Sequence, residues 1–305
     1  MKKRSSLITV VIPVRNRVRL LLEALSSLAE SEVICSTIVV DDGSSESLAE
    51  AKRHLRGTVT WLESGGRGPG AARNLGAAAA TTEYLVFLDS DDLFFRDTLA
   101  AIEEAIYSAS RRPAVVLMRP LPFRSDRQPV LQRNRGELSL GKFDDIVTVP
   151  GYLRRDGIRF AAIRRDIFRH VGGFNENVTH CEDLDLLLRV GAGFPAVFVL
   201  EPPLLAYRKH SDQAVNSVRA FVDGHKFLRA QLDRGAYPAS NRLKRHCIDW
   251  IAESARMICC RLILAGDVSL ARKFYFSTAV MQLRMGKLRF LAGFWWLWFK
   301  SLVRH

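Results

Sequence analysis

The 305-residue sequence has few cysteines and no long hydrophobic run. Its five cysteines form no C-x-x-C pair and their number is odd, so a reducing compartment fits better than a disulfide framework or a zinc site. The apolar run at 290–299 is about half of the roughly 20 residues that a membrane-spanning helix needs. The apolar run at 7–14 is short and continues directly into arginines. It is interpreted as a buried strand and not as a signal peptide.

Acidic side chains are scarce in the last third of the chain. Residues 1–205 carry 27 basic and 26 acidic side chains, whereas residues 206–305 carry 18 and 6, and no carboxylate side chain follows Asp267. The formal net charge of +13 therefore lies almost entirely in the last third. Because the pattern becomes all-helical beyond about residue 215, we expect a first domain at 1–215 and a basic helical extension at 216–305.

Strands and helices alternate in the first 120 residues. Apolar residues make up 48% of the chain and charged residues 25%, which is ordinary for a globular protein with a core. We expect strands at 7–14, 33–40, 58–62, 84–88 and 114–118, and helices at 18–30, 46–56, 71–80 and 97–109. This alternation predicts an α/β fold with a doubly wound sheet.

The middle of the chain has a weaker pattern. Residues 119–150 mix Pro, Arg and Asp and are expected to form a loop region that carries an acceptor-side lid. A strand around 158–163, a helix at 182–191 and a strand at 196–200 are expected to follow. In the extension, Gly266 is predicted to end one helix and Asp267 to cap the next.

Polar side chains follow the predicted strands at 7–14, 33–40 and 84–88. In a doubly wound sheet, ligands bind outside the carboxyl ends of the strands. We therefore expect five polar residues to lie near one crevice: Asn16, Asp41, Asp42, Asp89 and Asp91.

The acidic segment 89–92 points to a divalent cation. Carboxylates this close together repel one another unless a cation neutralises them. Mg²⁺ and Mn²⁺ prefer oxygen ligands and often bind one or two carboxylates together with phosphate oxygens. A turn followed by a helix N-cap is the alternative, since Asp is favoured there.

Two further segments fit a nucleotide ligand. Asp42, at the end of a parallel strand, is placed to accept a hydrogen bond from a base N–H or a ribose, although an ordinary turn has the same sequence. The segment 68–76 would bring backbone N–H groups and Arg73 close to a pyrophosphate. Its alternative is a plain helix start with Arg73 in solvent.

In order and spacing, these segments resemble inverting glycosyltransferases of family 2, which have the GT-A fold. The matching segments are VVIPVRN at 10–16, VVDDGSS at 39–45, GPGAARNLG at 68–76, FLDSDD at 87–92, VGGFNE at 171–176, CEDLDL at 181–186 and YRKH at 207–210. Each one is weak evidence alone, but seven in the family's order form a strong signal over roughly residues 5–215. The resemblance implies a GT-A fold with a mixed sheet.

On the donor side, the resemblance implies a nucleotide-sugar site, with a UDP-sugar preferred. Asp42 would hold the nucleobase, in a pocket lined by the backbone of Pro13 and Val14. Arg73 would contact the nucleotide. Asp89 would contact the ribose or the edge of the metal site.

For catalysis, the resemblance implies that Asp91 ligates Mn²⁺ or Mg²⁺ and that His210 adds a metal or phosphate contact. Asp183 would be the general base that deprotonates the acceptor hydroxyl. A lone histidine is as often structural, and Asp183 has an alternative role as a capping carboxylate on its helix.

The expected reaction is the transfer of one sugar to a saccharide or lipid-linked acceptor in polysaccharide or glycolipid synthesis. The Q-x-x-R-W signature of processive synthases is absent, which indicates single transfer. A sugar nucleotidyltransferase is a second hypothesis, suggested by the glycine-rich loop at 65–70. A catalytically silent membrane-associated scaffold is a third, and the three aspartates Asp42, Asp91 and Asp183 argue against it.

Residues 286–305 resemble an interfacial anchor. Three tryptophans lie between basic residues, and indole rings and Lys or Arg favour the headgroup region of an anionic membrane. We expect a cytoplasmic protein that binds peripherally to the cytoplasmic membrane face. Packing of these aromatics onto the domain, or a dimer contact, is the alternative. No nucleic-acid partner is expected, because no recognised binding module accompanies the charge.

Overall fold

The computed structural model describes residues 5–54, 59–127, 129–131, 136–150, 153, 161–178, 180–191, 193–209, 218–237 and 240–303. Within these ranges the chain forms an eight-stranded sheet and a three-stranded sheet. The larger sheet has the order β3 (Val59–Glu63), β2 (Ile34–Asp41), β1 (Ser5–Val14), β4 (Tyr84–Phe87), β9 (Ala161–Arg164), β6 (Val115–Met118), β10 (Ala196–Glu201) and β8 (Ser139–Phe143). The smaller sheet has the order β5 (Leu93–Phe94), β11 (Leu205–Lys209) and β7 (Pro120–Arg124).

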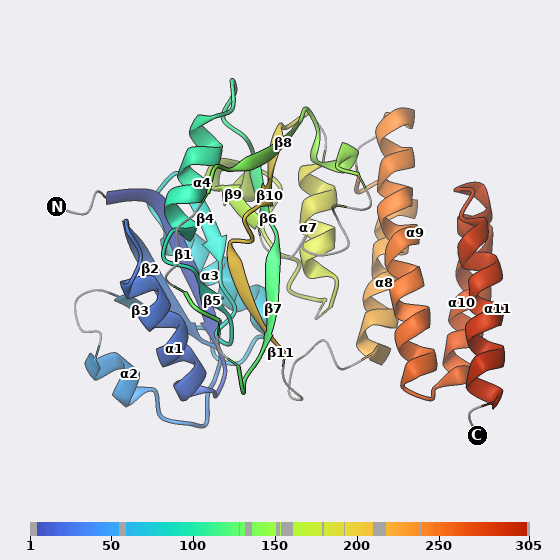
Figure 1. Cartoon of the computed structure of the whole chain (residues 1–305), viewed down its shortest axis with the longest axis horizontal. Helices are drawn as coiled ribbons and strands as arrows, with labels where there is room; N and C mark the ends of the chain where they lie inside the picture. The colour runs from blue at the N-terminus through green and yellow to red at the C-terminus, as the bar shows by residue number, and fades with distance from the viewer. Residues whose placement is uncertain are drawn as a thin grey trace.

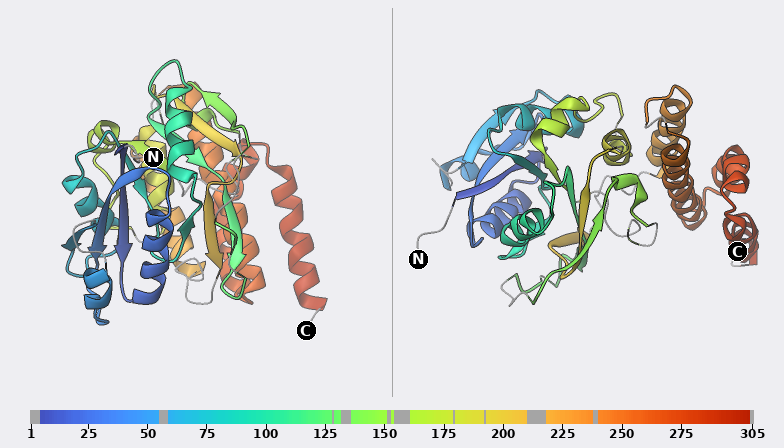
Figure 2. Two further views of the ribbon diagram at one scale, coloured as in Figure 1. Left: turned by 60° about the vertical axis from the view of Figure 1, so that its left-hand side comes forward. Right: turned by 90° about the horizontal axis from the view of Figure 1, so that it is seen from above.

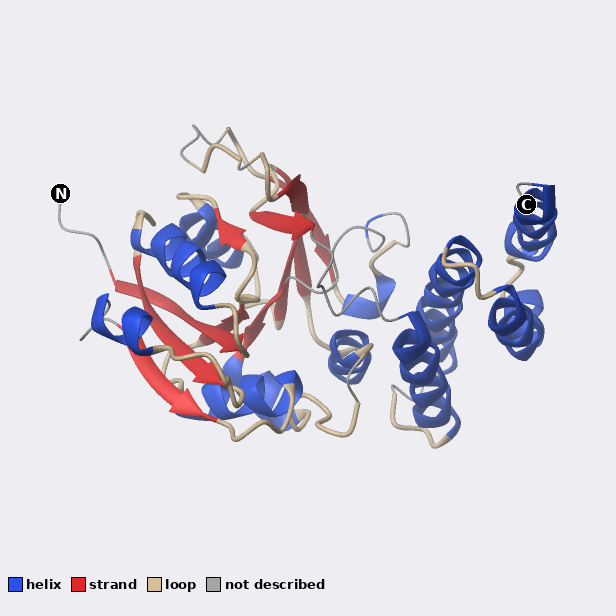
Figure 3. Ribbon diagram, turned by 90° about the horizontal axis from the view of Figure 1, so that it is seen from below, coloured by secondary structure: helices blue, strands red, loops and turns tan. Residues whose placement is uncertain are grey.

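Helices cover both faces of the larger sheet (Figure 3). One face packs against α1 (Val18–Ala29), α2 (Ala49–His54) and α4 (Thr98–Tyr107). The other face packs against α3 (Pro69–Ala79), α6 (Arg165–His170) and α7 (Glu182–Val190). Because both faces are covered, β1 is apolar almost throughout, and Ile8, Val10 and Val11 are fully buried.

The predicted fold class is confirmed, and the sheet is mixed. β1 pairs in parallel with both β2 and β4, and β6 pairs in parallel with β10. β9 runs antiparallel between β4 and β6, and β8 runs antiparallel to β10. The carboxyl ends of β1, β2 and β4 therefore lie side by side at one edge of the sheet.

The prediction of a loop region at 119–150 is wrong. The segment contains β7, β8 and the 3-10 turn η1 (Ile146–Thr148). Two prolines in β7, Pro120 and Pro122, concealed the strand, because proline weakens a strand pattern. β7 is an edge strand of the smaller sheet, where a residue without an N–H is tolerated.

The C-terminal extension consists of α8 (Val218–Asp233), α9 (Asn241–Leu264), α10 (Val268–Arg284) and α11 (Leu288–Val303). α7 lies between the sheet and the pair α8–α9, and α10 and α11 lie beyond that pair (Figures 1 and 2). The predicted cap at Asp267 is confirmed, because its Oδ1 accepts a hydrogen bond from the Leu270 N–H at 3.2 Å. Among the described residues, no helix is long and apolar enough to cross a membrane.

The extension shares a core with the first domain. Cys247, Trp250 and Ile251 of α9 belong to the same buried cluster as the apolar side chains of α7 and β10. Trp250 also donates a hydrogen bond from Nε1 to the Val147 carbonyl at 3.1 Å. A second cluster, formed by α8 to α11, includes Phe274, Tyr275 and Phe294.

Candidate active site

Asp42 follows β2 and is 4% exposed. Its carboxylate accepts a hydrogen bond from the Ser64 hydroxyl at 2.6 Å and from the Gly68 N–H, with 3.1 Å to each carboxylate oxygen. Gly43 next to it has φ +75, and a Cβ there would lie 3.1 Å from the backbone of Gly66. Asp42 thus holds the glycine-rich loop against the end of β2, where the predicted nucleotide pocket would be.

Pro13 and Val14 end β1 beside this loop. Both are buried, and the Val14 carbonyl accepts a hydrogen bond from the Asp42 N–H at 2.7 Å. The structure therefore brings three of the predicted nucleotide-binding residues, Pro13, Val14 and Asp42, together at one edge of the sheet. Their contact with a nucleobase stays a prediction.

An acidic cluster follows β4. Asp89, Asp91 and Asp92 each offer a carboxylate oxygen, and these oxygens all lie within 4.8 Å of one another. Asp91 and Asp92 are buried, whereas the side chain of Asp89 is 43% exposed. Because all three groups are hard oxygen donors close together, the cluster fits a Mg²⁺ or Mn²⁺ ion.

Arg17 reaches the acidic cluster from the end of β1. Its Nη1 lies 2.8 Å from Asp91 Oδ2. Asn16 and Arg17 have φ of 55 and 79, in the left-handed region that few side chains adopt. Asn16 Oδ1 accepts the Ser45 N–H at 2.9 Å, and Glu46 Oε2 accepts the Arg17 N–H at 2.7 Å, so the loop after β2 holds this turn in place. Asn16 is among the residues predicted from the sequence to lie here, whereas Arg17 is not.

Arg208 binds two residues of the acidic cluster, Asp91 and Asp92. It is 2% exposed, and its Nε donates to the Asp91 carbonyl at 2.8 Å, while its Nη2 donates to Glu23 Oε2 at 2.6 Å. Its N–H donates to Asp92 Oδ1 at 2.9 Å. Arg208 lies within the YRKH segment at 207–210, but no role for it was predicted from the sequence. The available signal was its position on the same face of β11 as the buried Ala206.

Arg73 connects the acidic cluster with α7. It is 8% exposed, and its guanidinium donates to Asp89 Oδ1 at 2.8 Å and to Glu182 Oε1 at 3.1 Å. Burial alone would lower the pKa of Arg73, but the charges of Asp89, Asp183 and Glu182 outweigh it and raise the pKa above its ordinary value. Arg73 is therefore a permanent cation between the two acidic groups. Its predicted contact with a nucleotide stays a prediction.

The glycine turn before α7 is fixed by Asn74. The Asn74 side chain donates to the Phe174 carbonyl at 2.9 Å and accepts the Phe174 N–H at 2.8 Å. Gly173 has φ +69, and a Cβ there would lie 2.6 Å from Asn74 Oδ1. The Phe174 ring packs edge-on against Phe87 at 5.0 Å and lies under the Arg73 guanidinium at 5.4 Å. The motif at 171–176 thus positions Arg73.

Asp183 lies in the first turn of α7, directly after Cys181 and Glu182. It is half-buried, and its charge is one of those that raise the pKa of Arg73. Burial, reinforced by the charges of Glu182 and Asp183, raises the pKa of the Cys181 thiol to about 12. A thiol with this pKa is neutral near pH 7, which makes it a poor nucleophile.

Asp185 has a structural role on the same helix. It is 1% exposed, and it accepts hydrogen bonds from the Tyr237 hydroxyl at 2.8 Å and from Arg189 Nε at 2.9 Å. Tyr237 follows α8, so the C-terminal extension is joined directly to the helix that carries Asp183. His210, the remaining predicted ligand, lies outside the described residues.

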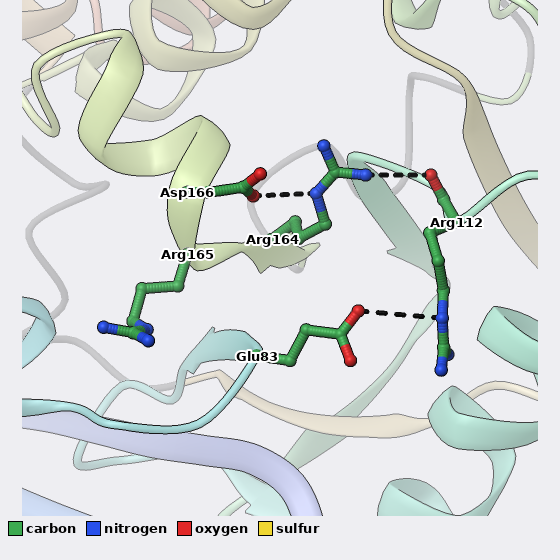
Figure 4. Close-up of a pocket in the computed structure, with 5 residues that line it drawn as sticks. All are labelled: Glu83, Arg112, Arg164, Arg165 and Asp166. Atoms are coloured by element: carbon green, nitrogen blue, oxygen red, sulfur yellow. Dashed lines mark hydrogen bonds and ion pairs between the residues drawn. The ribbon is translucent and has the colours of Figure 1, made fainter.

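A separate cavity of about 330 Å³ lies near the amino ends of β4 and β6. Figure 4 shows the side chains that line it. It is lined by Glu83, Arg112, Arg164, Arg165 and Asp166. Arg164 Nε donates to Asp166 at 2.7 Å, and Arg112 lies 3.6 Å from Glu83. These charges pair with one another at the amino end of β4, whereas the acidic cluster follows its carboxyl end. The cavity is therefore not the candidate active site.

The family model for "Glycosyl transferase family 2" matches residues 9–172, which include β1, the glycine-rich loop and the acidic cluster. Over 227 residues the chain is 35% identical to the pre-mycofactocin glycosyltransferase of Mycobacterium tuberculosis, which covers 71% of this chain and 46% of that protein. The chain spans only between 14% and 46% of the length of the first curated relatives that it matches.

Two solved structures share the fold. Staphylococcus aureus TarS 1–349 in complex with UDP-GlcNAc has a TM-score of 0.57 at 15% identity, covering 92% of each chain. The mannosyltransferase PcManGT from Pyrobaculum calidifontis, in complex with GDP-Man and Mn²⁺, has a TM-score of 0.55 at 18% identity, covering 98% of this chain and 87% of that one. At these identities the likeness concerns the arrangement of the backbone.

Proposed function

Since the chain belongs to glycosyl transferase family 2 and has the GT-A fold, we propose that it transfers one sugar from a nucleotide diphosphate sugar to a hydroxyl of a saccharide or lipid-linked acceptor, with inversion at the anomeric carbon. The observation that carries the proposal is the cluster of Asp89, Asp91 and Asp92 at the carboxyl end of β4. Arg73 links this cluster to the helix that carries Asp183.

The donor nucleotide would lie along the carboxyl ends of β1 and β2. Asp42 has two carboxylate oxygens with about four acceptor positions, of which Ser64 and Gly68 use three. The remaining position would accept an N–H of the base, beside the main chain of Pro13 and Val14. The solved structures of TarS and PcManGT, which share the fold, contain UDP-GlcNAc and GDP-Man. Both uracil and guanine nucleotides are therefore included in the binding experiment below.

The diphosphate would lie at the acidic cluster. Asp91 and Asp89 would hold a Mn²⁺ or Mg²⁺ ion, which when bound neutralises the charge that develops on the leaving diphosphate. Arg17, now paired with Asp91, is a second cation at the same place. Arg208 holds the main chain of Asp91, so the position of that carboxylate is set before any ligand arrives.

Asp183 would act as the general base. Its carboxylate takes the proton from the acceptor hydroxyl while that oxygen forms a bond to the anomeric carbon and the bond to the diphosphate breaks. Attack from the side opposite the leaving group inverts the anomeric centre.

We further propose that the reaction takes place in the cytoplasm, at the inner face of a membrane where lipid-linked acceptors are met. The basic charge of the last third supports this location, because anionic lipids attract lysine and arginine.

Thermal unfolding against UDP, GDP, CDP and dTDP, each with and without Mn²⁺, tests the donor site. A nucleotide at a hundred times its dissociation constant adds roughly 2.7 kcal/mol of stability. The expected result is a rise in Tm for one nucleotide that requires Mn²⁺ and disappears in Asp91→Asn. Asp223→Asn, on the exposed surface of α8, is the matched control and should keep the shift.

The identity of the reaction needs a product. Incubation with the nucleotide sugar that the shift selects should release the nucleoside diphosphate, and NMR of the new glycosidic bond should show the inverted anomer. Release of pyrophosphate from a nucleoside triphosphate and a sugar phosphate would instead indicate a nucleotidyltransferase. Failure of all four nucleotides to shift the Tm would overturn the donor site.

A further inference from the structure

The outer helices of the C-terminal extension expose large apolar side chains in regular rows. On α10, Phe276, Val280 and Leu283 are 57%, 63% and 61% exposed. Their spacing of four and three residues places them on one side of the helix. Such a row in contact with water marks an interaction surface more often than a chance exposure.

A matching row lies on α11. Leu288, Trp296 and Phe299 are 63%, 59% and 60% exposed. At 100° per residue they lie within about 80° of one another around the helix. These side chains face away from the core of the extension, which Phe290 and Phe294 of the same helix help to form.

The two rows form one continuous surface. The Phe276 ring contacts Trp295 edge-on at 6.1 Å, Trp295 contacts Trp298 at 5.2 Å, and Trp298 contacts Phe299 at 5.4 Å. Aromatic rings thus connect an exposed residue of α10 with an exposed residue of α11. We call the surface made by Phe276, Val280, Leu283, Leu288, Trp296 and Phe299 the apolar face.

Basic side chains border the apolar face. On α10, at 100° per residue, Arg272 lies on one side of the row, and Lys273 and Arg284 lie on the other; all three are exposed. Arg289 has the equivalent position on α11 and is also exposed. No Asp or Glu occurs in the sequence of either helix. A ligand for this face must therefore be apolar in the middle and negatively charged around it.

α10 and α11 lie at a distance from the sheet whose edge carries the acidic cluster (Figure 1). They form the end of the molecule farthest from β3, and α8 and α9 separate them from α7 and the sheet (Figures 1 and 2). A flat partner against this end would leave the edge of the sheet that carries the acidic cluster open to a donor.

We propose that the apolar face docks on an anionic lipid surface, with its aromatic and aliphatic side chains at the headgroup boundary and its basic border on the lipid phosphates. Tryptophan and phenylalanine partition into that boundary, and lysine and arginine are attracted to anionic headgroups. The inference rests on the membrane location in the proposed function, but not on sugar transfer.

The charge argues against the other occupants. A second copy of the chain would bring the same basic border against this one, and like charges repel. A nucleic acid would satisfy the arginines, but its phosphates offer no apolar surface to cover Val280 and Leu283. An anionic lipid surface supplies both kinds of contact.

Co-sedimentation of the full chain with vesicles tests the proposal. The vesicles are pure phosphatidylcholine, or phosphatidylcholine with about one third phosphatidylglycerol. We expect binding to the anionic vesicles, weak binding to the neutral ones, and a decrease in high salt, because salt screens the headgroup charge. Absence of binding to the anionic vesicles would overturn the proposal.

Paired variants locate the contact. Trp296→Ser with Phe299→Ser, or Arg272→Gln with Arg289→Gln, should each weaken vesicle binding by about tenfold or more. The matched controls are Val130→Ser, an exposed apolar residue that is 77% accessible on another surface, and Arg111→Gln with Arg127→Gln, two exposed arginines elsewhere. Equal binding by variants and controls would overturn the assignment of the face.

Two further readouts separate the competing explanations. The Tm and its nucleotide shift should be the same in the face variants and the wild type, which shows that the fold and the donor site are intact. If light scattering shows a dimer that the Trp296→Ser and Phe299→Ser substitutions dissociate, the face belongs to a second copy and the membrane proposal is wrong. Binding to duplex DNA that is lost in the same variants would likewise overturn it.

Discussion

Arg17 and Asp91 form an ion pair in which Nη1 lies 2.8 Å from Oδ2. Arg17 comes from the turn after β1 and Asp91 from the turn after β4, two neighbouring parallel strands. The guanidinium therefore neutralises one member of a cluster of three carboxylates. A divalent cation at this cluster would have to share Asp91 with Arg17 or displace it.

Substitution of Arg17 by Gln should raise the apparent affinity for Mn²⁺ several-fold, because the competing cation is removed. The same substitution should lower the Tm in the presence of a chelator, since the carboxylates then repel one another without a counter-charge. Differential scanning fluorimetry with EDTA and with a Mn²⁺ titration measures both effects. An affinity equal to that of the wild type would show that the ion and Arg17 do not compete.

Asp183 and Asp185 lie on the same helix, but we expect their substitution to affect different properties: activity for Asp183 and stability for Asp185. Asp183→Asn should lower kcat by about 10²–10⁴-fold, as expected for loss of a general base, and should keep the nucleotide-dependent rise in Tm. Asp185→Asn should lower the free energy of unfolding by about 1–3 kcal/mol, because its buried carboxylate accepts bonds from Tyr237 and Arg189. Turnover assays and urea denaturation distinguish the two. Full activity in Asp183→Asn would assign the base elsewhere.

Arg73→Met should destabilise the fold by about 3 kcal/mol, because it leaves Asp89 and Glu182 without the buried cation between them. Arg96→Met is the matched control. Its guanidinium is half-exposed and lies 3.8 Å from Glu32, so the loss should be below about 1 kcal/mol. Urea denaturation at neutral pH gives both values. A small effect at Arg73 would mean that water replaces its contacts.

His225 on α8 should make the protein sensitive to acid. Burial lowers its pKa to about 4; the hydrogen bond from Nε2 to the Ile251 carbonyl opposes the shift, and the charge of Arg229 adds to it. As the pH falls, the unfolded chain takes up a proton near 6.5, whereas the folded chain does so only near 4.

The free energy of unfolding should therefore decrease by up to about 3 kcal/mol as the pH falls from 6.5 to 4. Urea denaturation of the wild type and of His225→Leu across this range measures the difference. In the variant, the free energy of unfolding should depend less steeply on pH, because one proton fewer is taken up on unfolding. Parallel curves for the two proteins would contradict the pKa of His225.

The fold was predictable because its strands are buried on both faces. Residues 7–14 form an uninterrupted apolar run, which identified β1, and the polar turn after each strand identified the edge that carries the site. The strands β7 and β8 escaped prediction for a local reason. An edge strand needs neither a continuous apolar run nor a hydrogen bond from every backbone N–H. Pro120 and Pro122 are therefore compatible with β7, although prolines in a sequence usually indicate a loop.

The site was predictable only where one short segment carries the chemistry. Asp89, Asp91 and Asp92 are adjacent in sequence, and the structure brings their carboxylates together. Arg17 and Arg208 were missed because their roles depend on contacts between residues 74 and 117 positions apart. No local pattern contains such contacts, whereas Asp183 was found through a motif, and its role as a base stays a prediction.

The hydrogen bond between Tyr237 and Asp185 limits which chimeras of this enzyme and its relatives can fold. The segment after residue 172, beyond the family match, carries both α7 and the extension. A chimera that took α7 from one parent and α8–α9 from another would have to recreate the Tyr237 bond and the packing of Trp250 on Val147. A chimera should therefore exchange α7 together with α8 and α9, and a junction before α7 would keep Asp183, the proposed base, with the helices that support it.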